Sequence, residues 1–176
     1  MYDGTLVRLR ALEPEDIDAH HRWFNDPEIT RYLATRYPLP RARTAERVAD
    51  WMPTSYTSAH FAMERRDTGE LIGLAVLRDA TAEDRDAEVD FLIGERDAWG
   101  QGFGTDGMRT LCRFGFEEMG LHRIHLYVYT DNVAAIRLYE RLGFVREGVQ
   151  RHAFWKRGAW HDCLLMGLLA GELVEA

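Results

Sequence analysis

The residue types best suited to chemistry gather around one glycine-rich turn. A strand, a turn and an amphipathic helix are indicated by EVDFLIGERDAWGQGFGTDGMRTL, in which Gly102, Gly104 and Gly107 have the spacing GxGxxG. Because glycine removes side chains from the turn, the backbone N–H groups of Gln101 to Thr105 can converge at the positive end of the helix. The pattern predicts a phosphate-binding loop, and an ordinary glycine turn into a helix is the alternative.

Three classes of phosphate site compete for this loop. A P-loop needs Lys and then Ser or Thr after its last glycine, whereas Met108 and Arg109 follow Gly107, so this class is excluded. The dinucleotide fingerprint is matched literally, and Asp131 follows at a tolerable distance. However, ERDAWGQ separates the strand from Gly102, and too few strands follow for a dinucleotide fold. A dinucleotide-binding protein therefore stays open as a less well supported alternative.

Two carboxylates precede the loop on the same strand. Alternation along AEVDFLIG places Glu88 and Asp90 on one face, opposite Ala87, Val89 and Phe91. Two acids beside a reaction site could attract a cationic amine and take its proton through water. A solvated strand face explains them equally well, so both interpretations stay open.

Other reactive residue types show weaker patterns. Tyr139 falls on a helical stripe with Leu138 and Leu142, and spacing alone indicates a core position. The histidines form no HExxH or Cys/His set, so no metal site is expected. The two cysteines, Cys112 and Cys163, are far apart in apolar settings and are predicted to be buried, reduced thiols.

Composition limits the class of protein. The 176 residues are 46% hydrophobic and 29% charged, which predicts one folded domain over residues 1–176. The net charge of −7 argues against nucleic acid as a partner. No apolar run approaches the ~20 residues of a membrane span, and no signal peptide is apparent. We therefore expect no membrane partner and a cytoplasmic location.

The hydrophobic period predicts the order of elements. Strands are expected at 5–12, 59–66, 70–79, 87–94 and 122–130, with a closing hairpin of 144–155 and 159–169. Helical segments are expected at 15–24, 28–33, 44–52, 104–119 and 132–143. This order predicts an α/β fold with a mixed sheet and helices on its faces.

The segments WGQGFGTDG and HLYVYTDNVAAIRLYERLGF closely resemble motifs A and B of the GCN5-related N-acetyltransferases (GNAT). WFNDPEITRYL and the C-terminal hairpin are similar to the RimJ/RimL-like branch, named for acetylation of ribosomal-protein N-termini. Trp99 stands where the wider family often has Arg or Gln. The resemblance implies a single-domain, mostly antiparallel central sheet flanked by helices, with a splayed strand pair for acetyl-CoA.

The resemblance also implies where the cosubstrate acetyl-CoA binds. Its pyrophosphate would rest on the amides of Gln101 to Thr105, a stretch that contains Gly102, Phe103 and Gly104. Its pantetheine arm would pair with the strand edge at Phe91, Leu92 and Ile93, and an N–H near Leu92 would stabilise the oxyanion. Asn132 would cap the following helix and contact the cosubstrate arm.

The resemblance also implies which residues are catalytic and which bind the acceptor. Tyr139 matches the motif B tyrosine whose phenol faces the CoA sulfur, which suits a general acid. Glu88, or Asp90, is the candidate base. Trp23, Phe24 and Asn25 lie in the segment that covers the acceptor pocket, although the aromatic pair could equally be core.

We therefore expect direct transfer of an acetyl group to a primary amine, either a protein N-terminal α-amine or a small-molecule amine, in a ternary complex and without a metal. A homodimer is compatible with the resemblance. A non-catalytic acyl-CoA-binding or regulatory module is the alternative from another class, because fold does not fix function.

Overall fold

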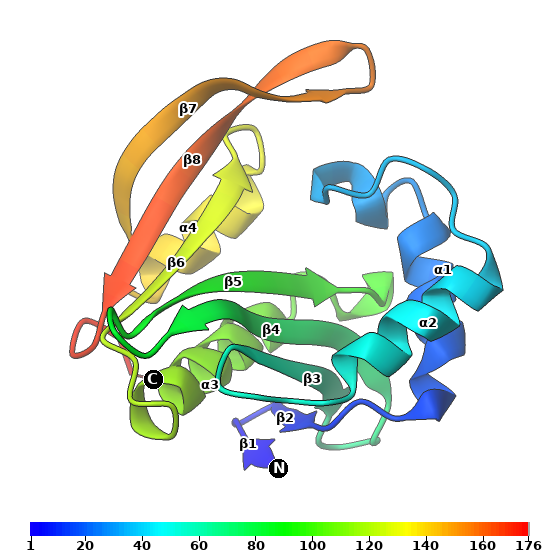
Figure 1. Ribbon diagram of the computed structural model, residues 1–176, viewed down its shortest axis with the longest axis horizontal. Helices are drawn as coiled ribbons and strands as arrows, with labels where there is room; N and C mark the ends of the chain where they lie inside the picture. The colour runs from blue at the N-terminus through cyan, green and yellow to red at the C-terminus, as the bar shows by residue number, and fades with distance from the viewer. Residues whose placement is uncertain (176) are drawn as a thin grey trace.

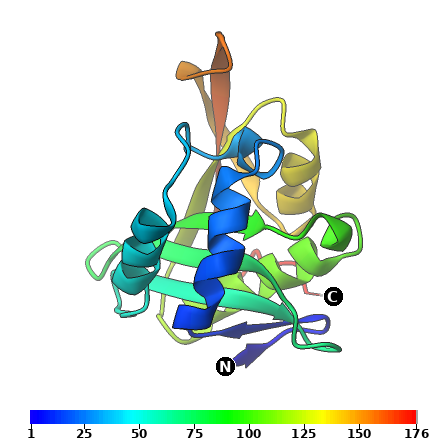
Figure 2. The ribbon, with the colours of Figure 1, turned by 90° about the vertical axis from the view of Figure 1, so that its right-hand side faces the viewer.

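A computed structural model describes residues 1–175, and their eight strands form one sheet with helices on both faces (Figures 1 and 2). The strands are β1 (Tyr2–Asp3), β2 (Val7–Arg10), β3 (Ser58–Arg65), β4 (Leu71–Thr81), β5 (Asp86–Ile93), β6 (Arg123–Tyr129), β7 (Val145–Lys156) and β8 (Ala159–Leu169). The α-helices are α1 (Ile17–Asn25), α2 (Arg41–Trp51), α3 (Phe103–Glu117) and α4 (Val133–Arg141). Short 3-10 helices are η1 (Pro14–Asp16), η2 (Ile29–Tyr32) and η3 (Arg96–Ala98).

The topology confirms the α/β class and the mostly antiparallel sheet. The strand order is β1-β2-β3-β4-β5-β6-β8-β7, and within residues 1–175 the pair β5–β6 alone is parallel. The closing hairpin pairs through β8, which lies between β6 and β7. The sequence patterns predict neither this insertion nor the short strand β1.

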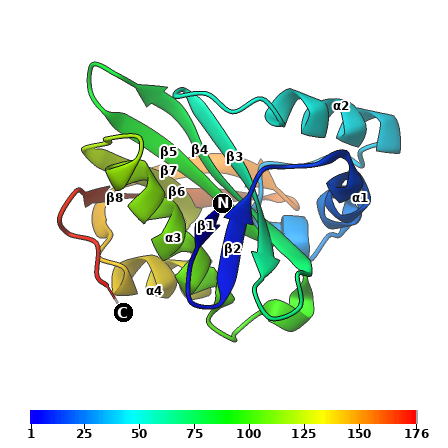
Figure 3. The same ribbon diagram turned by 90° about the horizontal axis from the view of Figure 1, so that it is seen from below.

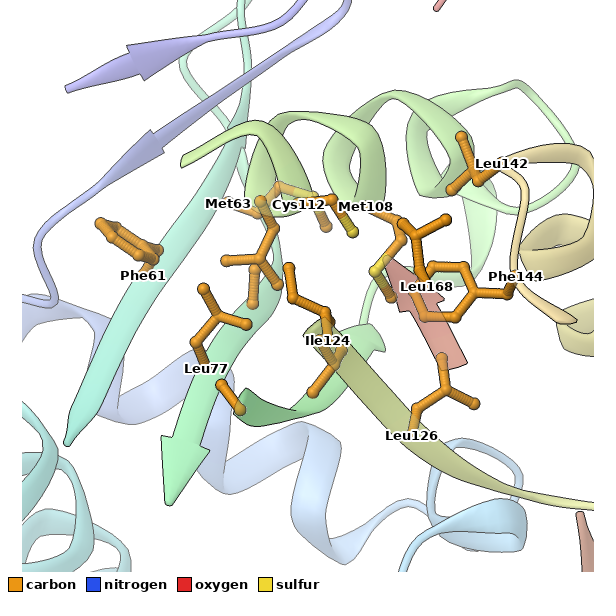
Figure 4. Packing of buried hydrophobic residues seen from close by; sticks show 14 of the residues in the cluster. Phe61, Met63, Leu77, Met108, Cys112, Ile124, Leu126, Leu142, Phe144 and Leu168 are labelled. Atoms are coloured by element: carbon orange, nitrogen blue, oxygen red, sulfur yellow. The ribbon is translucent and has the colours of Figure 1, made fainter. Parts of the chain in front are cut away.

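Helices lie on both faces of the sheet (Figure 3), and an apolar layer holds them to each face. The larger layer lies under α3 and α4, where Met108, Leu111 and Cys112 are fully buried as their spacing predicts (Figure 4). The smaller layer joins α1 to the opposite face through Trp23 and Phe24. Both cysteines are free and buried, as expected.

Strands β5 and β6 separate after a short parallel ladder. Their paired residues are Asp86 with Arg123, Ala87 with Ile124 and Glu88 with His125. Beyond this point β5 continues along β4, while β6 rises away from it beside β8 (Figure 1). This divergence is the expected splayed strand pair, and it leaves one edge of β5 without a strand partner in the described chain.

A buried carboxylate fixes the start of α3. Asp106 accepts the backbone N–H groups of Thr5 (3.0 Å), Leu6 (2.7 Å) and Val7 (3.0 Å). A carboxylate is a strong acceptor for several amide donors, so this contact joins the turn before β2 to the first turn of α3. The glycine loop therefore begins from an anchored helix end.

A buried histidine on α1 predicts how stability depends on pH. His20 is fully buried, and neither ring nitrogen has a hydrogen-bond partner among residues 1–175. Burial lowers the pKa of His20 to about 4, against a smaller opposing effect of Asp16. The unfolded chain regains a pKa near 6.5, so it binds the proton first, and stability is lost as pH falls from about 6.5 to about 4.

We expect His20→Leu to remove this loss. The stability advantage of the wild type over the variant should shrink by on the order of 3 kcal/mol between pH 7 and pH 4. Urea unfolding of both proteins across this range measures the difference, in which other titrating groups cancel. A constant difference would contradict the assignment.

Candidate active site

The glycine loop presents a row of unused backbone donors. Gly100 (φ 73°) and Gly102 (φ 92°) have left-handed backbone that favours glycine, and Gly102 caps α3. Within residues 1–175, no hydrogen bond uses the N–H groups of Gln101 to Thr105. First-turn amides have no partner in their own helix, and they carry the positive end of its dipole. The loop can therefore accept a phosphate group.

The other glycines of the GxGxxG pattern serve packing. A Cβ at Gly107 would lie 2.4 Å from the Met63 sulfur, and one at Gly104 would lie 3.0 Å from Leu138 Cδ1. The ring of Phe103 is buried, with the Arg65 guanidinium 5.0 Å from its centroid, so its side chain is not available to a ligand. The spacing that imitates a dinucleotide fingerprint thus reflects close helix packing.

Gly102→Val should weaken binding of CoA at least tenfold, because a β-branched residue at φ 92° must displace the loop. Stability should fall as well, since the strain exists whatever space is free. Gly69→Val is the matched control: its φ is 73° in the turn between β3 and β4, and no atom lies within 4 Å of a Cβ there. Calorimetry should show unchanged CoA affinity for the control. Unchanged affinity for Gly102→Val would contradict the phosphate loop.

Along the open edge of β5, the backbone groups that face the opening come from every second residue. The Gly94 N–H donates to Ile72 O of β4 at 2.8 Å. Because backbone groups alternate sides along an antiparallel strand, the Leu92 amide also faces β4, and the amides of Phe91 and Ile93 face the opening. A backbone donor for an oxyanion on this edge would therefore be the N–H of Phe91 or Ile93, the two neighbours of Leu92, near which the donor is expected. The Trp99 indole donates to Ile93 O at 3.0 Å, so it occupies one acceptor of this edge.

Helix α4 carries the other two residues taken from motif B. Asn132 caps the helix, with its side chain accepting the Ala135 N–H at 3.3 Å, as predicted. The half-buried Tyr139 ring lies 5.7 Å from the Phe144 ring. Burial, and to a smaller extent the Asp90 charge, raise the pKa of Tyr139. Its hydroxyl is therefore protonated at neutral pH, and it has no hydrogen-bond partner within residues 1–175.

Glu88 and Asp90 share one face of β5, but they differ in surroundings. The Glu88 side chain is 17% exposed and that of Asp90 is 58% exposed. Arg78 of β4 contacts both, with Nε donating to Asp90 Oδ2 at 2.6 Å and Nη2 donating to Glu88 Oε1. Burial raises the pKa of Glu88, Arg78 opposes this, and Asp90 adds to it. The pKa of Glu88 therefore lies above that of a free carboxyl, and its side chain is the more buried of the two.

Charged residues extend across this face of the sheet. Arg78 contacts Asp79, Glu88 and Asp90, and Arg123 contacts Asp86 and Glu147. Five carboxylates thus share two guanidinium groups. The face is acidic, which favours a cationic molecule over an anionic one.

The three residues expected at the acceptor pocket have different surroundings. Trp23 is buried, and its indole donates to Glu95 Oε1 at 2.9 Å. Phe24 packs in the smaller layer under the Arg47 guanidinium. Asn25 bonds both backbone groups of Leu39 and so holds the segment before α2. Trp23 is the one of the three that lines a surface pocket of about 340 Å³, together with Asp26, Ile29 and Gly94 to Asp97.

Sequence reasoning missed two residues of this site. Arg78 and His125 contact Glu88 from the neighbouring strands β4 and β6. Only strand register brings them there, because Arg78 pairs with Glu88 across β4–β5 and His125 pairs with it across β5–β6. Alternation within a single strand carries no signal for either contact.

No helix within residues 1–175 has the length and apolar character to span a membrane. No group of three or more His, Cys, Asp or Glu in the same residues is arranged to hold a metal ion.

Known acetyltransferases are similar to this chain in sequence. An acetyltransferase (GNAT) domain model matches residues 7–145. The uncharacterized N-acetyltransferase YoaA of Bacillus subtilis is 32% identical over 161 residues, covering 88% of each chain. The spermidine N(1)-acetyltransferase of Escherichia coli K12 is 28% identical, covering 94% of this chain and 87% of the relative.

A solved structure agrees with these relatives. The spermidine N-acetyltransferase of Vibrio cholerae, crystallised with CoA and spermine, superposes with a TM-score of 0.87 and is 28% identical, covering 96% of this chain and 98% of that one. The chain belongs to the GNAT family of acetyl-CoA-dependent N-acetyltransferases.

Proposed function

We propose that this enzyme transfers the acetyl group of acetyl-CoA to the primary amine of a small cationic molecule such as a polyamine. The observation that carries the proposal is the acidic face over the ladder of β5 and β6, where Glu88 and Asp86 lie with Glu147, and which Asp90 extends toward the open part of β5. An ammonium group is attracted to such a face. The similarity to spermidine acetyltransferases supports the same acceptor class.

Acetyl-CoA would be held by backbone groups. The free amides of Gln101 to Thr105 would bind the pyrophosphate, and the open edge at Phe91 and Ile93 would pair with the pantetheine arm. Because Trp99 bonds Ile93 O, we propose that its indole moves when the arm pairs there. Asn132, already a helix cap, stands at the start of α4 beside the same opening.

The reaction then needs three proton or charge functions. Glu88 removes the proton from the acceptor ammonium, and the neutral amine attacks the thioester carbonyl. The Phe91 or Ile93 N–H stabilises the oxyanion. Tyr139 donates its hydroxyl proton to the departing thiolate, for which a protonated phenol is suited.

A thiol-release assay tests the proposal. The wild-type protein is incubated with acetyl-CoA and, separately, with spermidine, a neutral-tailed monoamine, an amino sugar and a peptide with a free N-terminus. We expect the highest kcat/KM with the polyamine. Preference for the peptide would favour the protein N-terminus instead, as the RimJ/RimL-like resemblance implies.

Two other outcomes would favour the remaining alternatives. Tight CoA binding without turnover on any amine would indicate a non-catalytic acyl-CoA-binding module. Binding of NAD with no affinity for CoA, measured by calorimetry, would indicate that the glycine loop belongs to a dinucleotide-binding site.

A further inference from the structure

We propose that His125 carries protons between Glu88 and solvent, with Asp86 holding its ring in place. The inference rests on the proposed function, because it assigns the route by which the base Glu88 is restored after each turnover. His125 does not touch the reacting atoms, so it is a positioning residue that acts through Glu88.

The parallel ladder between β5 and β6 places the three residues together. Asp86 and Glu88 are two residues apart and share one face of β5. His125 pairs with Glu88 in register, and its ring reaches both carboxylates. Its Nδ1 lies 3.1 Å from Asp86 Oδ1, and its Nε2 lies 4.0 Å from Glu88 Oε2. The imidazole therefore bridges the candidate base to a second acid.

The contact with Asp86 selects one tautomer. An ionised carboxylate only accepts hydrogen bonds, so Nδ1 must carry the hydrogen between His125 and Asp86. The neutral ring then directs the Nε2 lone pair toward Glu88. Two acceptors face each other while Glu88 is ionised, which agrees with the 4.0 Å separation. Protonation of Glu88 supplies the missing donor, and a small rotation or one water closes the gap.

The proton balance of the reaction requires such a route. At neutral pH the acceptor is an ammonium ion, and the products are a neutral amide and a thiol, so each turnover releases one proton. That proton passes from the ammonium to the Glu88 carboxylate. It then passes to His125 Nε2, while the Nδ1 proton moves toward Asp86 and solvent. The proton lost by nitrogen as the amide forms goes to the thiolate.

The environment favours His125 as the carrier. Glu88 Oε1 is bonded to Arg78, which cannot give up its proton, so Oε2 is the oxygen available for transfer. The Asp86 side chain is 29% exposed and opens the route to water. Charged or titratable groups near Glu88 and His125 come from every neighbouring strand: Arg78 and Asp79 of β4, Asp86 and Asp90 of β5, Arg123 and Tyr127 of β6, Glu147 of β7 and Cys163 of β8.

The test uses two substitutions. His125→Asn keeps an N–H for Asp86 but cannot carry a proton, whereas His125→Ala leaves space for added imidazole. For His125→Asn we expect kcat to be about tenfold lower near neutral pH, which is a modest part of what a general base contributes. The acid limb of its pH–rate profile should move to higher pH. The KM for acetyl-CoA should not change. For His125→Ala we expect kcat to rise with imidazole concentration.

A double variant distinguishes a proton relay from a purely structural role of His125. If the proton passes through Glu88, His125→Asn should not lower kcat further in a protein that already carries Glu88→Gln. His122→Gln is the matched control, because His122 is exposed and lies directly before the same strand, and it should keep the wild-type pH profile. Thermal unfolding checks that each variant folds.

The outcomes distinguish the two proposals. An unchanged pH profile for His125→Asn, no rescue of His125→Ala by imidazole, or a full further loss in the Glu88→Gln background would overturn the relay alone. A folded wild-type protein that releases no thiol with any amine would overturn the proposed function and the relay with it.

Discussion

Tyr139→Phe should slow acetyl transfer by roughly 10²-fold, because in the proposed mechanism the phenol hydroxyl protonates the departing thiolate. The substitution keeps the ring against Phe144 and removes one oxygen atom. Affinity for acetyl-CoA should barely change, since the hydroxyl acts mainly in the transition state. Single-turnover kinetics, under conditions where chemistry limits the rate, measure the loss, and calorimetry measures CoA binding.

Tyr2→Phe provides the matched control for that variant. The Tyr2 ring is also half-buried against the larger apolar layer, with Phe114 at 4.6 Å, but it lies on β1, away from the opening. Removal of the Tyr2 hydroxyl should leave turnover unchanged. A loss of activity in Tyr139→Phe matched by an equal loss of CoA affinity would make Tyr139 a cosubstrate contact. Full activity in Tyr139→Phe would indicate that water, and not Tyr139, protonates the departing thiolate.

Glu88→Gln should lower kcat by 10²-fold or more, about what removal of a positioned general base costs. Because burial raises the pKa of Glu88, the wild-type rate should increase with pH as this carboxyl ionises, and the variant should lose that limb. CoA affinity should stay the same, because the side chain lies on the acceptor face of β5. A pH–rate profile from pH 5 to 9 measures both effects.

Asp90→Asn gives the comparison that decides between the two acids. Asp90 shares the Arg78 contact with Glu88 but is much more exposed. If Glu88 is the base, Asp90→Asn should keep the acid limb and raise KM for a cationic acceptor. Loss of the limb in Asp90→Asn alone would transfer the role to Asp90, and a wild-type profile in both variants would make the pair a solvated strand face.

Strand register decided which of the predicted residues are brought together. Alternation predicts that Glu88 and Asp90 share a face, and they do. It does not predict Arg78, which bonds both acids, because that contact depends on how β4 pairs with β5. The same limit applies to Leu92: the sequence places it on the strand, but only pairing with β4 shows that its amide faces away from the opening.

The sequence by itself predicted most of the elements and the glycine turn from local patterns, and the family from the resemblance of its motifs. Apolar period, turn residues and helix caps act over a few neighbouring residues, so the chain itself carries them in readable form. The tertiary structure alone decided the insertion of β8 between β6 and β7, the free edge at Phe91 and Ile93, and the contact of His125 with Glu88. These features join residues tens of positions apart, and their geometry follows from long-range strand pairing and packing, for which no local pattern exists.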